Sequence, residues 1–331
     1  MNEFSITIGR YVKGNSFLHR IDPRTKIIGT IILMVAIFLI PAKSINSLYV
    51  LLGIFGVLLL VILCSRIGFI SFIKGLQPIL LISLFTFFLQ IIYNKDGDVI
   101  KNLAINFSAL TIIIMVLLII IYALTAKFIK LKFIYFVLLF LLAIVSLNLV
   151  DVGTFKHSSL LITKLGLIKG SFYCLRIVLA VMISTILTMS TSPNDINLGL
   201  EWVLHPLTWI KIPVSTFTMM LSLTLRFIPT LSVETSKIMK AQASRGIDFS
   251  EGNLLQKIKQ ITTLLVPMFA LSIAKAEDLA NAMEVRGYVV GAKRTSINLL
   301  RFRVLDLFGL VFALGILASA ILARIYLWEL N

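Results

Sequence analysis

Long apolar stretches separated by short polar segments dominate the first part of the chain and return at its end. A transmembrane helix needs about 20 mainly apolar residues, within a range of about 17–25. The first stretch is slightly short, but Lys26 and Lys43 bracket it, and their long side chains can reach the headgroup region. Seven stretches are therefore predicted to be transmembrane helices: residues 27–42, 45–64, 78–93, 103–126, 133–150, 167–192 and 304–328.

The segment between the last two stretches has a different pattern. Ser192-Pro193-Asn194-Asp195 predicts a helix start, with Ser as the N-cap and Pro in the first turn. Further on, 12 uncharged residues precede Arg226 and 14 precede Lys275. Both uncharged stretches are shorter than a membrane span, so they favour amphipathic helices at the membrane surface.

Composition confirms the class and gives an orientation. With 59% hydrophobic residues, 14% charged residues and a mean hydropathy of +1.01, the chain is an integral membrane protein. Under the seven-helix topology, 23 Lys and Arg lie in segments on the N-terminal side and five in loops on the other side. The positive-inside rule then places the N-terminus in the cytoplasm. The net charge of +16 reflects this bias rather than binding to nucleic acid, and the lipid bilayer is the expected surroundings.

The predicted architecture is all-α, with about seven transmembrane helices and a cytoplasmic-face domain of amphipathic helices. Residues 1–26 form a cytoplasmic leader, and residues 27–192 form the first set of membrane helices. Residues 193–303 form the cytoplasmic-face domain, and residues 304–331 form the last transmembrane helix.

One six-residue pattern, Ala-x-x-x-Arg-Gly, occurs twice within that domain. The first copy runs from Ala241 to Gly246 and the second from Ala282 to Gly287, so their arginines, Arg245 and Arg286, are 41 positions apart. An Arg in the last turn complements exposed carbonyl groups, and a following Gly can adopt the left-handed conformation that ends a helix. Two such helix ends in a basic region beside membrane spans predict a paired docking device.

Few residues are candidates for chemistry inside the membrane. Arg176 lies within a predicted span, and two interpretations stay open: a role in transport, or a structural pairing with a backbone carbonyl or a neighbouring helix. The sequence has no phosphate-binding loop, no H-E-x-x-H pair and no G-x-S-x-G turn. No intrinsic catalysis, cofactor or metal is therefore expected in this chain.

Four separated motifs resemble the transmembrane T component (EcfT, CbiQ-like) family of energy-coupling factor (ECF) transporters. They are the leader from Tyr11 to Lys26, the segment Arg226-Phe227-Ile228-Pro229-Thr230, and the two copies of the six-residue pattern, Ala241–Gly246 and Ala282–Gly287, called here the Arg-Gly boxes. The resemblance implies a non-catalytic scaffold in the bacterial cell membrane. Such a scaffold joins two ABC-type ATPases, which bind ATP and Mg, to a substrate-binding S component for vitamin or metal-ion uptake.

In that family the boxes end coupling helices, and their arginines enter grooves on the ATPases. The resemblance therefore assigns ATPase docking to the two box arginines and to their neighbours, and packing or coupling to three further residues. The docking set is Arg245, Arg286, Ser244, Gly246, Val285, Gly287, Ala241 and Ala282, and the packing set is Arg176, Arg226 and Pro229.

The chain departs from the family pattern in two places. Ser244 and Val285 stand before the arginines where the family has Ala, so these positions are expected to influence partner preference. Residues 103–150 are interpreted as an additional two-span insertion.

Two alternative functions remain. A conventional ABC permease would form the substrate path itself, for which only Lys169 and Arg176 are candidates within the spans. An intramembrane enzyme is less favoured, because no catalytic cluster is present in the sequence.

Overall fold

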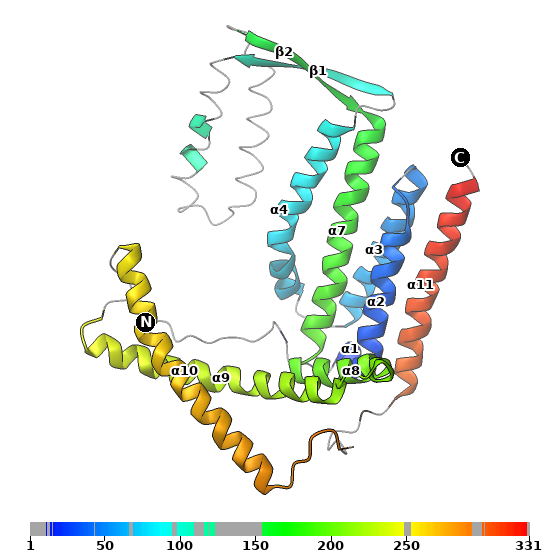
Figure 1. Cartoon of the computed structure of the whole chain (residues 1–331). Coiled ribbons are helices and arrows are strands. Elements are labelled where there is room, and N and C mark those ends of the chain that lie inside the picture. Colours follow the sequence, from blue (N-terminus) through cyan, green and yellow to red (C-terminus); the bar gives the residue numbers. More distant parts are fainter. Residues whose placement is uncertain are drawn as a thin grey trace. The chain divides into compact units, whose positions relative to one another are not determined.

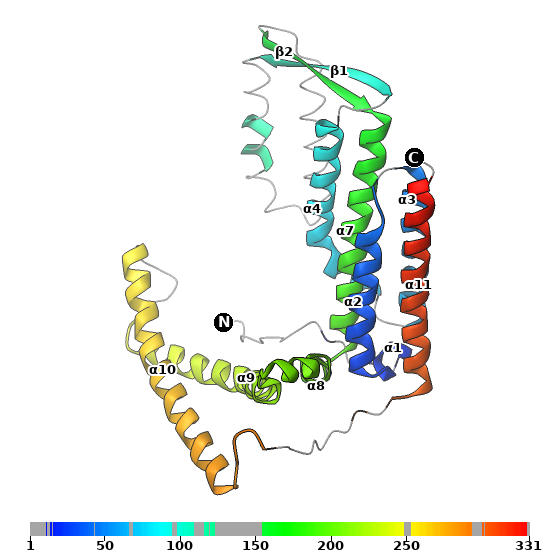
Figure 2. The ribbon, with the colours of Figure 1, turned by 45° about the vertical axis from the view of Figure 1, so that its right-hand side comes forward.

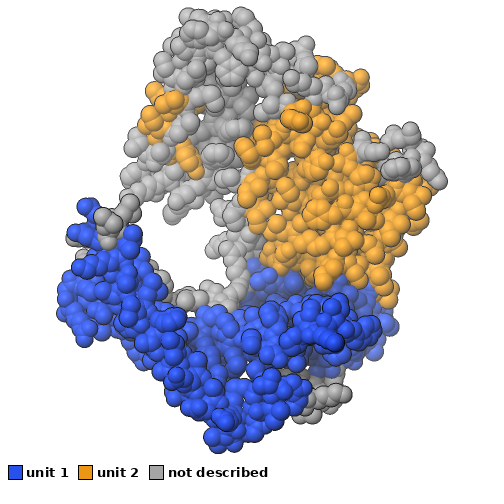
Figure 3. Space-filling model, viewed as in Figure 1, with its two compact units in different colours: residues 1–28, 187–310 blue, residues 29–186, 311–331 orange. Residues whose placement is uncertain are grey.

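The computed structural model describes residues 11, 14, 16–42, 44–65, 69–94, 98–108, 116–118, 120–122, 154–247, 253–292, 300 and 302–329. The chain forms two compact units (Figure 3). Unit 1 contains Met1–Ile28 and Leu187–Leu310, and unit 2 contains Gly29–Ile186 and Val311–Asn331.

Unit 2 is built from long helices that lie side by side in both ribbon views (Figures 1 and 2). They are α2 (Pro23–Leu39), α3 (Ile45–Cys64), α4 (Phe69–Tyr93), α7 (Lys164–Ser190) and α11 (Val304–Glu329), of which α2, α7 and α11 each have one end in unit 1. Helix α3 has the bounds that the sequence predicts. It buries a single stripe of side chains, at Leu51, Ile54, Leu58 and Ile62, and exposes others such as Leu60, as expected of a helix with one face toward lipid.

The predicted bounds of α2 and α7 are each shifted by a few residues, and two larger differences concern α4 and residues 99–108. Helix α4 begins at Phe69, nine positions before Pro78, so Pro78 lies inside the helix and does not begin it. Residues 99–108, part of which was predicted to begin a span at Leu103, form strand β1 (Val99–Ser108).

Strand β1 pairs antiparallel with β2 (Thr154–Thr163), a segment predicted to be a polar connection. Leu103 pairs with Leu160 and Ile105 with Ser158. The prediction of a transmembrane helix is therefore wrong for residues 103–108. Most of the remainder of that stretch, and all of the predicted span 133–150, lie outside the described residues.

The helical membrane class is confirmed. Within the described part of the chain, five helices are long and apolar enough to cross a membrane by length and composition. These candidate spans are Ile45–Cys64, Lys164–Ser190, Val214–Ser244, Gln256–Val285 and Val304–Tyr326. The paired strands are a local exception to the all-α architecture, and the total of seven spans stays a prediction.

Unit 1 contains α1 (Phe17–Arg20), α8 (Pro193–Leu204), η1 (His205–Ile210), α9 (Val214–Ser244) and α10 (Leu254–Val285). The predicted start of α8 is confirmed, since the Asp195 amide donates to Ser192 Oγ at 3.2 Å. Helices α9 and α10 are 31 and 32 residues long. They continue through Arg226 and Lys275, so the uncharged stretches underestimated their lengths.

Helix α9 packs against both α8 and α10. On the first side, Asn197 Nδ2 donates to the Thr218 carbonyl at 2.9 Å. On the second side, α10 crosses α9 at an angle (Figures 1 and 2). The contacts at this crossing include two polar ones: Thr235 Oγ1 lies 3.2 Å from Met268 Sδ, and Lys275 Nζ lies 3.8 Å from a carboxylate oxygen of Glu234.

Candidate functional site

The first Arg-Gly box forms the C-terminal end of α9. Arg245 is the C-cap residue, and Gly246 follows it with a φ of 85°. The amide of Gly246 donates to the Ala243 carbonyl at 3.0 Å, and the amide of Ile247 donates to the Gln242 carbonyl at 3.2 Å. These two bonds define a Schellman motif, which requires the left-handed residue that Gly supplies. The predicted helix stop is confirmed.

The second box has the same structure at the end of α10. Arg286 is the C-cap residue, and Gly287 has a φ of 71°. The amide of Gly287 donates to the Glu284 carbonyl at 2.9 Å, and the amide of Tyr288 donates to the Met283 carbonyl at 3.0 Å. Two segments that share only Ala, Arg and Gly thus end in the same hydrogen-bonded turn.

Both box arginines are exposed. Among the described residues, neither guanidinium group has a hydrogen-bond or ion-pair partner. Val285 is 89% exposed, whereas the Ser244 hydroxyl is bonded to the Lys240 carbonyl of its own helix at 3.1 Å. Ala241 and Ala282 are also exposed, one turn before each arginine. Each box therefore presents five donor N–H groups on a rigid helix end with little side-chain bulk around them.

The remaining predicted site residues are outside the two boxes. Arg226 and Pro229 are exposed on α9, and Arg226 is about 28 Å along the helix from Arg245 at ~1.5 Å per residue. Arg176 lies on α7 in unit 2, where its guanidinium group donates to the Ile40 carbonyl and lies 4.4 Å from the Phe172 ring centroid. This geometry favours the structural interpretation of Arg176.

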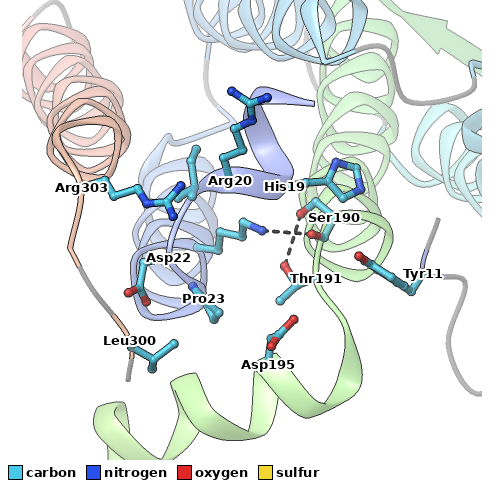
Figure 4. A pocket seen from close by; sticks show the side chains of 12 residues that line it. Tyr11, His19, Arg20, Asp22, Pro23, Ser190, Thr191, Asp195, Leu300 and Arg303 are labelled. Atoms are coloured by element: carbon cyan, nitrogen blue, oxygen red, sulfur yellow. Dashed lines mark hydrogen bonds between the residues drawn. The ribbon is translucent and has the colours of Figure 1, made fainter. Parts of the chain in front are cut away.

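The leader motif forms a second polar site, within unit 1. Its residues line a cavity of about 370 Å³ together with residues from the end of α7, the start of α8 and the segment before α11 (Figure 4). Lys26 Nζ donates to the Ser190 carbonyl at 3.0 Å, the bond drawn in Figure 4 as the dashed line from a nitrogen atom to Ser190. Burial lowers the pKa of Lys26 to about 8, although the nearby charges of Asp195, Asp22 and Asp306 act in the opposite direction.

Asp306 was not identified from the sequence as part of this site. Its carboxylate is 1% exposed and accepts two backbone hydrogen bonds, from the Asp22 amide at 2.6 Å and from the Arg303 amide. Asp22 in turn caps α2, since its Oδ1 accepts from the Arg24 amide at 2.9 Å. One buried carboxylate thus joins the N-terminal ends of α2 and α11 through residues, Asp22 and Asp306, that are 284 positions apart.

An aromatic clamp holds the leader on its other side. The Arg24 guanidinium carbon lies 5.4 Å from the Trp202 ring centroid and 5.6 Å from that of Phe302. The two rings are themselves in edge contact, with centroids 6.2 Å apart. Stacked and partly buried, Arg24 acts as a packing residue as well as a cation.

Comparison with known proteins decides the family. Residues 99–297 match the family model described as CbiQ, cobalt transport protein. The energy-coupling factor transporter transmembrane protein EcfT of Listeria innocua is 38% identical over 299 residues, which cover 90% of this chain and 91% of the relative. The chain belongs to the CbiQ/EcfT family.

Other EcfT proteins are similar over comparable lengths. The Bacillus subtilis protein is 37% identical over 291 residues, covering 88% of each chain, and the Streptococcus equi protein is 35% identical over 313 residues, covering 94% of each. The CbiQ match includes β1, β2, α7, α8, α9, α10 and both Arg-Gly boxes. The chain is therefore a multi-pass membrane component of a transport system, as the four motifs predicted.

Proposed function

We propose that this chain is the transmembrane T component of an ECF-type importer. In this role it couples ATP hydrolysis by two partner ATPases to reorientation of a substrate-binding S component, for uptake of a vitamin or a metal ion. The observation that carries the proposal is the shared geometry of the two boxes. Each is a Schellman-capped helix end that presents an exposed arginine with no partner within the part of the chain that the structure describes. Family membership supports it through the printed names of the relatives.

Arginine suits a docking contact of this kind. Its planar guanidinium group makes several hydrogen bonds in a fixed geometry and is weakly hydrated, so it enters a groove at modest desolvation cost. The Schellman turn fixes the direction of the backbone at each arginine, which lowers the entropy lost on docking. ATP and Mg belong to the partner subunits in this proposal, and the described part of this chain contains no cluster of side chains that would hold a metal.

The crossing of α9 and α10 supports a lever mechanism. Arg245 lies about 15 Å beyond Thr235, and Arg286 about 27 Å beyond Met268, at ~1.5 Å per residue. When the ATPases approach each other on binding ATP, they would displace both helix tips, and the contacts at the crossing would transmit that displacement. The exposed apolar side chains of the same two helices, such as Phe217, Met220 and Phe269, would then move against the S component.

The topology follows from the same proposal. The N-terminal leader 1–26 and the coupling domain 193–303 face the cytoplasm, where the ATPases bind, as the distribution of Lys and Arg predicts. Residues 27–192 and 304–331 provide the membrane helices. Residues 103–150 are an additional element that begins within β1, so its two spans stay a prediction only beyond residue 108.

The docking role is tested by replacing Arg245 and Arg286 with Ala, singly and together. Truncating a buried charged contact costs about 2–5 kcal/mol, so ATPase attachment should weaken at least roughly 30-fold. The matched control is Lys240→Ala, which removes another exposed cation near the same end of α9. Copurification of the ATPases with the tagged chain measures attachment, and unchanged copurification and uptake in the double variant would refute the docking role.

The lever is tested separately through the ion pairs of Glu234. Lys275 pairs with it across the crossing at 3.8 Å, whereas Lys237 pairs with it inside α9 at 3.6 Å. Lys275→Met should lower uptake per ATP hydrolysed while leaving ATPase attachment intact, and Lys237→Met should change neither. Equal behaviour of the two variants would show that the crossing does not transmit motion.

The conventional permease alternative predicts a different result. It requires the chain and its ATPases to move substrate without an S component, so reconstitution of those subunits alone in liposomes separates the two functions. The structural pairing of Arg176 with the Ile40 carbonyl leaves that alternative with fewer polar groups for a substrate path.

A further inference from the structure

The turn between α8 and α9 exposes four large apolar side chains close together in the sequence. Trp209 is 86% exposed and Ile210 74%, and they are followed by Ile212 at 44%. Leu207 on the same turn is 37% exposed. Full exposure of a Trp beside three aliphatic side chains to water would be costly, at about 25 cal/mol for each Å² of apolar surface.

Several polar groups of this turn are hydrogen-bonded within the turn itself. The amide of Lys211 donates to the Thr208 carbonyl at 3.0 Å, and the amide of Ile212 to the Leu207 carbonyl at 3.4 Å. The Thr208 hydroxyl donates to the His205 carbonyl at 2.7 Å. Lys211 closes the turn in the left-handed conformation, with a φ of 63°. Internal hydrogen bonds of this kind lower the cost of moving these groups into a poorly hydrated environment.

The turn follows a candidate membrane span closely in the chain. Helix α7, a candidate span, ends at Ser190, and α8 begins at Pro193. Helix α8 is 12 residues long, so the turn begins about 18 Å further along the chain at ~1.5 Å per residue. Residues 205–213 contain Lys211 and His205 but no acidic residue, which suits an anionic lipid surface.

We propose that residues 207–212 form an anchor that inserts into the bilayer interface. Trp209 occupies the boundary between headgroups and acyl chains, Ile210 and Leu207 enter the acyl region, and Lys211 extends back toward lipid phosphates. Trp is enriched at this depth because its ring is amphipathic, and Lys reaches the headgroups through its flexible stem.

This anchor adds a function to α9 that ATPase docking does not include. Helix α9 begins at Val214, two residues after the anchor, and Val214 is itself buried. The anchor would hold the N-terminal end of α9 at the bilayer interface, while the C-terminal end of the helix carries Arg245. The inference rests on the turn and the membrane class alone, so the docking proposal can fail without affecting it.

The test measures the depth of Trp209 in the full-length chain. Trp202→Phe and Trp328→Phe leave Trp209 as the only Trp of the chain. The protein is placed in nanodiscs of phosphatidylcholine and phosphatidylglycerol, with and without bromine on the acyl chains, and is also titrated with iodide in the aqueous phase. Two reference proteins carry a single Trp elsewhere, at the exposed position Leu322 of α11 or at the exposed position Val290 beyond the second box.

The expected result is a loss of Trp209 emission in brominated lipid that approaches the loss for Leu322→Trp, with little quenching by iodide. Quenching by iodide to the extent seen for Val290→Trp would overturn the proposal. Loss of the lipid quenching once the ATPases and the S component are bound would overturn it as well, because a partner protein would then cover the turn.

A second measurement protects the test from misfolding of Trp202→Phe, since Trp202 contacts Arg24. In a chain with Cys64 and Cys174 replaced by Ala, Ile210→Cys carries a nitroxide label, and its relaxation by oxygen and by a water-soluble nickel complex is compared. Preferential relaxation by oxygen supports insertion, and preferential relaxation by nickel contradicts it.

Discussion

Removal of the Asp306 carboxylate should loosen the leader from the start of α11. The carboxylate is buried, and it accepts hydrogen bonds from the backbone amides of Asp22 and Arg303. Asp306→Ala leaves both amides without an acceptor. Asp306→Asn keeps one acceptor oxygen and turns an amide group toward the other N–H. The predicted order of stability is therefore Asp, then Asn, then Ala.

The magnitude follows from the two bonds. A hydrogen bond to a charged group contributes about 1.5–3 kcal/mol, so Asp306→Ala should cost about 3–6 kcal/mol and Asp306→Asn about half of that. The loss is local, because it concerns the amides that the carboxylate binds. Since 1.4 kcal/mol corresponds to a factor of ten, exchange at those amides should accelerate at least roughly 100-fold in Asp306→Ala.

Hydrogen exchange read by mass spectrometry, on peptides that contain Asp22 and Arg303, measures this opening directly. Asp98→Ala is the matched control, since it also removes an Asp, but from an exposed pair with Lys164 at 3.5 Å. Exposed pairs contribute about 0–1 kcal/mol, so this variant should leave exchange at the leader unchanged. Unchanged protection of the two amides in Asp306→Ala, or an equal effect of Asp98→Ala, would refute the assignment of Asp306 as the residue that joins α2 to α11.

Three further outcomes are expected. Gly246→Ala should destabilise the end of α9 by about 1–2 kcal/mol, because φ is positive there, although nothing crowds the new methyl group. Gly53→Ala, equally uncrowded but inside α3, should be neutral or stabilising. Local hydrogen exchange and the melting temperature measure both effects. Because the folded-state pKa of Lys26, about 8, lies below its usual value of 10.5, the unfolded chain binds more protons between these values. The melting temperature relative to Lys26→Met should therefore rise with pH from about 8 to 10.5, and a flat difference would contradict this. Arg176→Lys should lower the melting temperature in detergent and leave uptake per folded molecule unchanged; lost uptake with an unchanged melting temperature would instead favour the transport interpretation.

Local signals explain what the sequence predicted well. The start of α8 at Ser192 and the two helix ends at Gly246 and Gly287 depend on residues within one turn of each other, and all three were found from the sequence. The bounds of α3 were predicted because no charge interrupts its apolar run. The lengths of α9 and α10 were predicted less well. Both helices continue past Arg226 and Lys275, the charged residues at which the uncharged stretches end.

Strand β1 shows where counting apolar residues led to a wrong prediction of a transmembrane helix. Leu103, Ile105 and Phe107 alternate with smaller or polar residues, a period of two that is typical of a strand. The prediction instead counted these residues toward a spanning helix. The strand depends on pairing with β2, whose residues lie 46 to 64 positions from their partners, so no local stretch of sequence contains the pairing.

The Asp306 junction and the Arg24 clamp were missed for the same reason. Each joins segments that are distant in the sequence, and a single Asp or Arg at those positions carries no recognisable pattern. The acidic residue near the start of α11 was visible, but only the fold shows that it binds the amide of Asp22.

The position of the helix crossing has a consequence for the two proposed partners. Measured from its two contacts, Thr235–Met268 and Glu234–Lys275, the crossing lies about 15–17 Å from Arg245 and about 17–27 Å from Arg286, at ~1.5 Å per residue. A rigid rotation of both helices about the middle of the crossing would therefore move the second tip farther than the first. Two ATPases that move symmetrically would then meet unequal displacements. Pro267 lies next to Met268 at the crossing and interrupts the hydrogen bonding of α10, so bending there can absorb part of the difference. Replacing Pro267 by Ala should stiffen α10, and we expect it to impair uptake more in a complex with two identical ATPases than in one with two different ATPases.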